Sequence, residues 1–299
     1  MNFEDNSKLK IGKGAIGLFS QNTTRFKDTF KFNNTSSKQL EVSLDENSAF
    51  AFFNGSGNID IATEAINKQV KFSQMKKGST FGYAKGTSVV SLGDNIDMTV
   101  TAKFATPEDG TSVLVASEGA AVKLSPSKTL KATTHIGLVA TNGSASTKPK
   151  AINEGTIEFE RVEGVGLYAN NLSEATNETT GKITMKKEGS AGIFGVKNST
   201  LTNKNIVELV EKKSAGIYAQ DSDTTNAVTA GSPVKKATID LTKEESVGIY
   251  SILTKEANGN KKILNAKLGT DKAKIVVGTV STSSAGIYGK LTTDANTVT

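Results

Sequence analysis

Apolar and polar residues recur along this chain as a six-residue block with a fixed order of side chains. A small or polar residue usually opens the block, glycine or an apolar residue holds the third position, and an aromatic residue or valine holds the fifth. The clearest copies read Ser-Ala-Gly-Ile-Tyr, at residues 214–218 and 284–288. The third position falls at residues 17, 50, 81, 113, 137, 166, 192, 216, 248 and 286. Self-similarity with a period of about 30 residues is typical of repeat architectures.

A stretch of alternating apolar and polar residues precedes the block in the later repeats. It begins nine residues before the third block position, at residues 157, 183, 207 and 239. Alternation with a period of two predicts half-buried strands. Each repeat is therefore expected to hold one strand, a short turn, the block as a second strand, and a variable loop.

These features predict an all-β fold, a right-handed parallel β-helix (solenoid) of about ten coils. Helical repeats would need apolar residues at i, i+3 and i+4, and propeller blades would need about 40 residues with four strands each. We expect residues 1–299 to be a single β-helix fragment of a larger protein, with diverged coils in 1–134 and regular coils in 135–299. Loop insertions are expected at 220–236 and 252–268.

Alternation within the block predicts which side chains face the interior. In the copy at 214–219 it places Ala215, Ile217 and Ala219 inside and leaves Gly216 and Tyr218 outside. The outward fifth position carries an aromatic row: Phe19, Phe52, Tyr83, Tyr168, Phe194, Tyr218, Tyr250 and Tyr288. Stacked rings stabilise a sheet by packing on one another. The alternative is a stripe that binds sugar or protein, in which Tyr168, Tyr218, Tyr250 and Tyr288 contact the partner.

The two predicted insertions are the other candidate for partner contact, because loops can vary without disturbing a rigid stack. They follow equivalent blocks on adjacent coils, so we expect them to emerge side by side. The first carries Asp221 and Asp223, and the second carries Lys261 and Lys262. Asp221 and Asp223 also resemble half of a calcium site, but no glycine and glutamate follow at ligand spacing.

Composition narrows the chemistry that the chain can perform. There is no cysteine, and His135 is the single histidine. Disulfides, thiolate metal sites and cysteine nucleophiles are thereby excluded, and His135, beside a turn, is expected to be incidental. The formal charge is +6, but lysines are interspersed with acidic residues instead of being concentrated as in nucleic-acid binders. We expect no metal, no cofactor and no nucleic-acid partner.

One motif points elsewhere and is rejected on its context. Gly12, Gly14 and Gly17 match the G-x-G-x-x-G fingerprint of dinucleotide-binding turns. Residues 18–24 read Leu-Phe-Ser-Gln-Asn-Thr-Thr, which is not the amphipathic helix that holds pyrophosphate on its N-terminus. Gly17 is the repeat glycine, so nucleotide binding is not expected.

The Ser-Ala-Gly-Ile-Tyr-Ala block, the preceding strands such as residues 153–159, and the arginine-poor, Lys/Asn/Ile-rich composition resemble a known family. They are similar to the passenger region of type V autotransporters, and among these to the very large fusobacterial surface adhesins. The resemblance is strongest over 135–290 and weaker before 110. It implies export through the outer membrane to the cell surface, and a membrane contact made only through a C-terminal barrel that this fragment lacks. It also implies adhesion to a protein or glycan on host cells or other bacteria.

Two further observations bear on these expectations. The N-terminus lacks the basic and apolar regions of a signal peptide, so we expect the chain to be cut from a longer protein. The Gly-Asp-Ser-Gly signature of protease passengers is absent from the sequence.

The alternative to an adhesin is a polysaccharide-active β-helix enzyme, a lyase or glycosidase, which gathers carboxylates on one face. The outward acids Glu158, Glu208 and Asp240 form no cluster of three on successive coils, so a non-enzymatic segment is expected, either an adhesin that binds a partner or a structural stalk.

Overall fold

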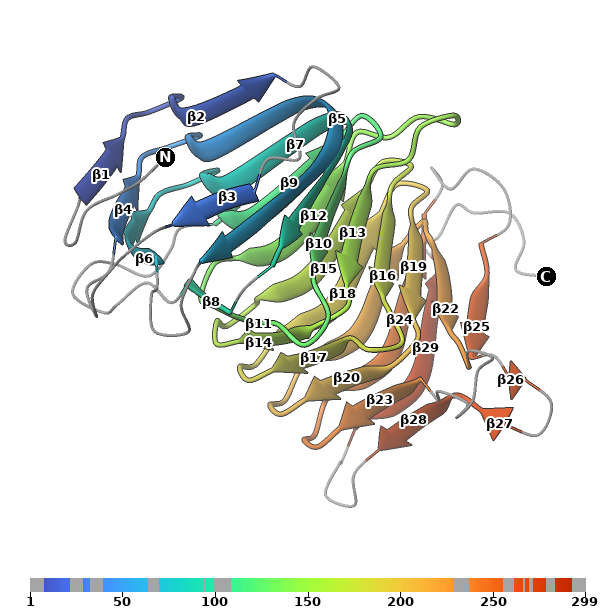
Figure 1. Cartoon of the computed structure of the whole chain (residues 1–299). Coiled ribbons are helices and arrows are strands. Elements are labelled where there is room, and N and C mark those ends of the chain that lie inside the picture. Colours follow the sequence, from blue (N-terminus) through green and yellow to red (C-terminus); the bar gives the residue numbers. More distant parts are fainter. Residues whose placement is uncertain are drawn as a thin grey trace.

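The computed structural model describes residues 8–21, 29–32, 40–63, 70–93, 95–98, 109–228, 237–254, 261–265, 267–268, 271–277 and 283–291. Within these residues all regular secondary structure is β-strand. Figure 1 shows the strands stacked as successive coils from the blue N-terminal end to the orange and red C-terminal end. The strands pair in parallel, apart from the small antiparallel pair of β26 (Lys267–Leu268) and β27 (Asp271–Lys272). The fold is a parallel β-helix, as the sequence predicts.

The predicted blocks form one continuous ladder of parallel strands. Its members are β2 (Ile16–Gln21), β5 (Ala49–Thr63), β7 (Thr80–Leu92), β9 (Ser112–Ser117), β12 (Ile136–Thr141), β15 (Val165–Asn170), β18 (Ala191–Val196), β21 (Ala215–Gln220), β24 (Val247–Leu253) and β29 (Ala285–Leu291). Neighbouring strands pair in block register, so that Leu167 lies opposite Ile193 and Ile193 opposite Ile217. The register holds from β2 to β29.

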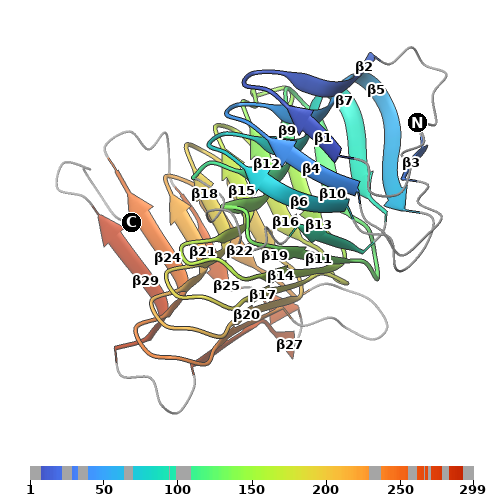
Figure 2. The same ribbon diagram turned by 90° about the vertical axis from the view of Figure 1, so that its left-hand side faces the viewer.

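The strand predicted before each block forms a second column. Its N-terminal part is the sheet of β1 (Lys8–Ile11), β4 (Leu40–Leu44) and β6 (Val70–Met75), which Figure 2 shows lying one beside another. The remainder is the sheet of β8 (Ile96–Met98), β11 (Thr129–Ala132), β14 (Thr156–Phe159), β17 (Lys182–Met185), β20 (Ile206–Leu209), β23 (Thr238–Leu241) and β28 (Lys274–Val277). Ile157, Ile183, Val207 and Ile239 pair in that order, which confirms the nine-residue offset.

A third strand follows each block before the last, β29, where the sequence predicted only a variable loop. In β5 and β7 it continues the block strand. Elsewhere it is separate: β3 (Thr29–Phe32), β10 (Ala121–Leu124), β13 (Lys150–Asn153), β16 (Glu174–Asn177), β19 (Thr200–Asn203), β22 (Asp223–Asn226) and β25 (Ile263–Asn265). Two of these strands lie inside the predicted insertions, β22 within 220–236 and β25 within 252–268. Residues 229–236 and 255–260 lie outside the described residues.

The block glycine faces the core, which corrects the outward position expected for Gly216. A Cβ at Gly216 would collide with the side chain of Ile239 in the next coil. Simple alternation fails here because Gly216 and Ile217 are both directed inward and buried. Ala215, expected inside, is half-buried, whereas Ile217 and Ala219 are fully buried.

Volumes at the third and fourth block positions compensate for each other. Two coils have a large third residue and a small fourth one, Phe50 followed by Ala51 and Phe81 followed by Gly82. Coils with glycine at the third position have leucine or isoleucine at the fourth. Since interiors are packed close to crystal density, these coils fill similar space with either arrangement, whereas Val113 and Leu114 are both fully buried in the coil of β9.

A ladder of buried asparagines closes the inner side of the third column. Asn153, Asn177, Asn203 and Asn226 are each 0% exposed. Each donates a hydrogen bond from Nδ2 to the Oδ1 of the next asparagine, with all four distances 2.8 Å, the last to Asn265. The ladder satisfies amide groups that would be costly to bury alone.

The part of the chain that the structure describes contains no helix with the length and apolar character of a membrane span.

Candidate functional site

The aromatic row is a physical stack in two parts. Phe19, Phe52 and Tyr83 form the first, with ring centroids 5.6 and 5.2 Å apart. The second comprises Tyr168, Phe194, Tyr218, Tyr250 and Tyr288, with successive separations of 5.6, 4.5, 5.1 and 5.0 Å. Val115 and Val139 occupy the equivalent positions between the two parts. The predicted stacking is confirmed, while the role of the tyrosines in partner binding stays a prediction.

Stacking covers both faces of the rings inside each stack, while Phe19 and Tyr288, at the ends, remain 60% and 44% exposed. The ring of Tyr218 is stacked between those of Phe194 and Tyr250. Tyr168 pairs with Phe194 on one side and with Val139 on the other. Burial raises the pKa of the Tyr168 and Tyr218 phenols above the ordinary value, so both keep their proton at neutral pH. The row therefore offers ring edges and phenol hydroxyls to a partner.

A groove of about 600 Å³ runs beside the second stack. The edges of Tyr168, Phe194 and Tyr218 form one wall, and residues of the turns that precede the blocks form the other. The floor consists of the residues at the second block position: Ile136, Val165, Ala191 and Ala215. The groove could not be predicted from the sequence, although Tyr168 and Tyr218 stood out there. Its depth depends on how far both the aromatic row and the row of turns rise above the floor residues.

The turn wall is built from residues with left-handed backbone. Glu163, Gly189 and Lys213 have φ angles of 57°, 69° and 57°. Each donates its backbone N–H to a carbonyl of the next coil, at 3.0, 3.2 and 3.4 Å. These bonds fix the turns in line along the helix axis. Since the three residues are exposed, the side chains of Glu163 and Lys213 stand on either side of a glycine gap.

One end of the groove gathers titratable groups. His135 accepts a hydrogen bond at Nδ1 from the backbone N–H of Gly110, at 2.9 Å. Arg161 pairs with Asp109 at 2.6 Å. Burial, followed by the nearby Arg161 charge, lowers the pKa of His135, so the neutral imidazole that accepts this bond is favoured. The sequence interpretation of His135 as incidental did not foresee that it lines the groove.

The predicted loop residues hold the coil together. Asp221 is 5% exposed, and its carboxylate accepts from the N–H and the hydroxyl of Thr254 at 2.7 and 2.6 Å. Asp223 accepts from the backbone N–H of Lys262 at 2.9 Å. Lys261 donates from Nζ to Asn198 Oδ1 at 2.6 Å. These contacts join neighbouring third-column turns, while Lys262 remains exposed.

Two of the three outward acids of the second column are paired with lysines. Glu158 Oε2 lies 2.8 Å from Lys186 Nζ, and Glu208 Oε2 lies 2.9 Å from Lys182 Nζ. Glu208 and Asp240 are neighbours in the ladder, and Thr184 separates Glu208 from Glu158. Among the described residues, no group of three His, Cys, Asp or Glu side chains could hold a metal ion.

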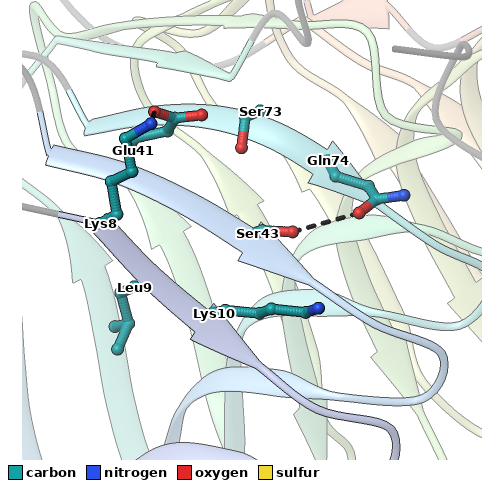
Figure 3. Close-up of a pocket in the computed structure, with 7 residues that line it drawn as sticks. All are labelled: Lys8, Leu9, Lys10, Glu41, Ser43, Ser73 and Gln74. Carbon is teal, nitrogen blue, oxygen red and sulfur yellow. Dashed lines mark hydrogen bonds and ion pairs between the residues drawn. The ribbon is translucent and has the colours of Figure 1, made fainter.

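A second, smaller hollow of about 290 Å³ lies on β1, β4 and β6 near the N-terminal end. Figure 3 shows its lining residues, among them Lys8 beside Glu41 and Ser43 beside Gln74. Lys8 pairs with Glu41 at 3.3 Å, and Ser43 donates to Gln74 Oε1 at 3.2 Å. With these polar groups engaged with each other, the groove beside the aromatic stack is the stronger candidate site.

Comparison with protein-family models gives a match over most of the chain. The family model described as the BigA third pectate lyase-like domain matches residues 3–231. No curated protein matches the chain, and neither does any solved structure. The matched region includes every residue that lines the groove.

Proposed function

Since the chain belongs to the family of BigA third pectate lyase-like domains, we propose that it is a non-enzymatic segment of a surface adhesin. The family match indicates a bacterial surface-exposed protein of the BigA type. "Pectate lyase-like" describes the β-helix, and a fold of this kind carries many functions. The segment is proposed to mediate or support attachment to host cells or to other bacteria.

The observation that carries this proposal is the groove along the second aromatic stack. Rigid, solvent-facing aromatic edges with a charged rim are the kind of surface that holds a macromolecular partner. The stack is held by backbone register over successive coils. A site on such a scaffold needs little ordering when it binds, so less of the interaction energy is lost.

The finer assignment rests on the sequence resemblance. We propose that the full protein is a passenger of the type V autotransporter kind, similar to the large fusobacterial adhesins, and that it reaches the cell surface through the outer membrane. The block pattern and the composition support this assignment. The sequence that flanks this chain in its gene tests it, because a C-terminal membrane barrel is required.

Attachment by the purified chain tests the adhesin role. Beads coated with the full chain should bind epithelial cells or bacterial cells, and free chain in solution should compete with them. Beads coated with an unrelated β-helix of similar charge serve as the control. If coated beads bind no better than the control beads to any cell type, the segment does not itself mediate attachment and at most supports it as a spacer.

The second candidate function is a polysaccharide lyase or glycosidase. The observation in its favour is that His135 and Glu163 line one end of the groove, with the charge of Arg161 close enough to lower the pKa of His135. Against it, Glu163 is the only carboxylate among the described lining residues, whereas glycosidases use a pair. Release of reducing ends or unsaturated sugars from acidic polysaccharides, abolished by Glu163→Gln or His135→Ala, would establish this alternative.

A further inference from the structure

The groove has one place where both its floor and its outer wall are lowest. The floor side chains shorten along the axis from Ile136 and Val165 to Ala191 and Ala215. The outer wall loses its side chain at Gly189, between Glu163 and Lys213. Opposite this gap stand the edges of Phe194 and Tyr218. This part of the groove is therefore lined by small floor side chains and by the edges of two aromatic rings.

This part of the groove suits an apolar group better than a sugar. Sugars bind aromatic residues through free ring faces, but the faces of Phe194 are covered by Tyr168 and Tyr218. The hydroxyl of Ser190, at the floor, donates to the carbonyl oxygens of Arg161 and Glu188 at 3.2 and 3.4 Å. A glycan placed here would lose hydration without gaining matching hydrogen bonds, which is costly.

The charges of Glu163 and Lys213, on either side of Gly189, would set the direction in which a partner segment binds. Within the described residues no ion pair engages Glu163, and Lys213 Nζ lies 3.9 Å from Glu245 in a contact between exposed side chains. Glu163 and Lys213 occupy equivalent turns two coils apart, which places them about 10 Å from each other along the axis. A partner segment that follows the axis would complement them with a basic residue at one end and an acidic residue at the other.

We propose that this groove binds an extended segment of a protein partner, whose bulky apolar side chain seats over Ala191 and Ala215. A basic residue of the segment lies toward Glu163 and an acidic residue lies toward Lys213. The inference deepens the proposed function, because it specifies the chemistry of the partner that this site would recognise in adhesion.

An immobilised peptide array tests the proposal with the full chain as the probe. Each peptide carries a central Leu, Phe or Ala flanked by a basic and an acidic residue, in both orders, and a glycan array runs in parallel. Leu or Phe peptides should bind about tenfold to a hundredfold more tightly than Ala peptides. One charge order should be preferred, and the double variant Glu163→Lys with Lys213→Glu should prefer the reverse order.

Filling the groove over Ala191 provides the site-specific control. Ala191→Phe should abolish peptide binding, while Ala285→Phe, at the equivalent second block position outside the groove, should leave it unchanged. Circular dichroism and thermal melting of both variants establish that they fold. Absence of peptide binding by the folded chain, glycan binding that Ala191→Phe removes, or self-association that Ala191→Phe removes would each overturn the proposal. Cell attachment by coated beads is scored separately, so the adhesin role can stand if this inference fails.

Discussion

The ring of Phe194 lies flat against the ring of Tyr218, with centroids 4.5 Å apart and planes 3° from parallel. The two residues are direct partners in the pairing of β18 with β21. Strands in a sheet are about 4.8 Å apart, which is close to the stacking distance of aromatic rings. Register between coils is therefore enough to form the stack, and the same register forms the inner wall of the groove.

Truncating the centre of this stack should destabilise the protein. Tyr218→Ala removes contacts with both Phe194 and Tyr250, and we expect a loss of about 1 kcal/mol or more in the free energy of unfolding. Urea denaturation measures it. Phe19→Ala is the matched control, because Phe19 is 60% exposed and ends the other stack, so its loss should be smaller. If Tyr218→Ala keeps full stability but abolishes cell attachment, the ring serves binding instead of packing.

The block glycine should tolerate no side chain inside the stack. Gly216→Ala places a methyl group against Ile239 and within 2.7 Å of the Gly248 carbonyl oxygen. Overpacking of this kind typically costs about 1–3 kcal/mol, and thermal melting should show it. Gly289→Ala is the control, since no described atom lies within 4 Å of the added Cβ. Equal melting temperatures for the two variants would contradict the inward position of Gly216.

Breaking the asparagine ladder at one position should lower the free energy of unfolding. Asn177→Ala leaves the Nδ2 of Asn153 and the Oδ1 of Asn203 without their ladder partner. A buried polar group left unsatisfied costs about 1–3 kcal/mol, so chemical denaturation should report a loss in that range. The exposed Asn58 on β5 gives the control variant Asn58→Ala, which should be nearly neutral. A neutral Asn177→Ala would mean that water replaces the missing amide.

The ion pair of Glu158 with Lys186 should make the stability of the fold decrease at low pH. The hydrogen bond from Lys186 lowers the pKa of Glu158, so the carboxylate stabilises the fold at pH values above its unfolded pKa. That contribution is lost as pH falls through the lowered folded pKa. We expect wild type and Glu158→Gln to differ in denaturation midpoint at pH 7 and to converge once the pH falls below the lowered pKa of Glu158 in the folded state. A difference that persists unchanged in acid would show that charge is not its cause.

How far the sequence predicts this structure depends on how local each signal is. The blocks around Gly192 and Gly216 repeat the same order of side chains, and equivalent positions pair in the structure. The ladder of block strands could therefore be predicted from the repeat alone. The third strand was missed because residues such as 174–177, Glu-Ala-Thr-Asn, are too polar and too short to signal a strand alone. They become one by pairing with neighbouring coils.

The candidate site was predictable only in part, for a related reason. Tyr168 and Tyr218 stand out because they share a block position. Glu163 and Lys213 do not stand out in the sequence. They line the groove because left-handed turns align across coils and place both side chains beside it. Asp221 and Asp223 looked like free loop acids in the sequence. Their hydrogen bonds to Thr254 and Lys262 come from the next coil, at a separation along the chain that no local pattern reveals.

The last prediction concerns His135, whose titration can be followed without ambiguity because it is the only histidine. Desolvation and the charge of Arg161 lower its pKa, against the weaker opposing effects of Asp109 and Glu163. Its Nδ1 accepts from the N–H of Gly110, and protonation would replace that lone pair with a second N–H. Acid should therefore break the contact between His135 and the Gly110 turn at the end of the groove.

Proton NMR of the imidazole ring should give a pKa below 6.5, and the Gly110 amide should shift over the same pH range. The sign of the stability change follows from the lowered pKa: the unfolded chain binds the proton first, so stability is lost as pH falls from about 6.5 to the folded pKa. In His135→Ala this part of the pH dependence should disappear, while the acid limb set by carboxylates such as Glu158 remains. A measured pKa at or above 6.5, with an unmoved Gly110 amide, would mean that the imidazole is solvated and does not hold the end of the groove.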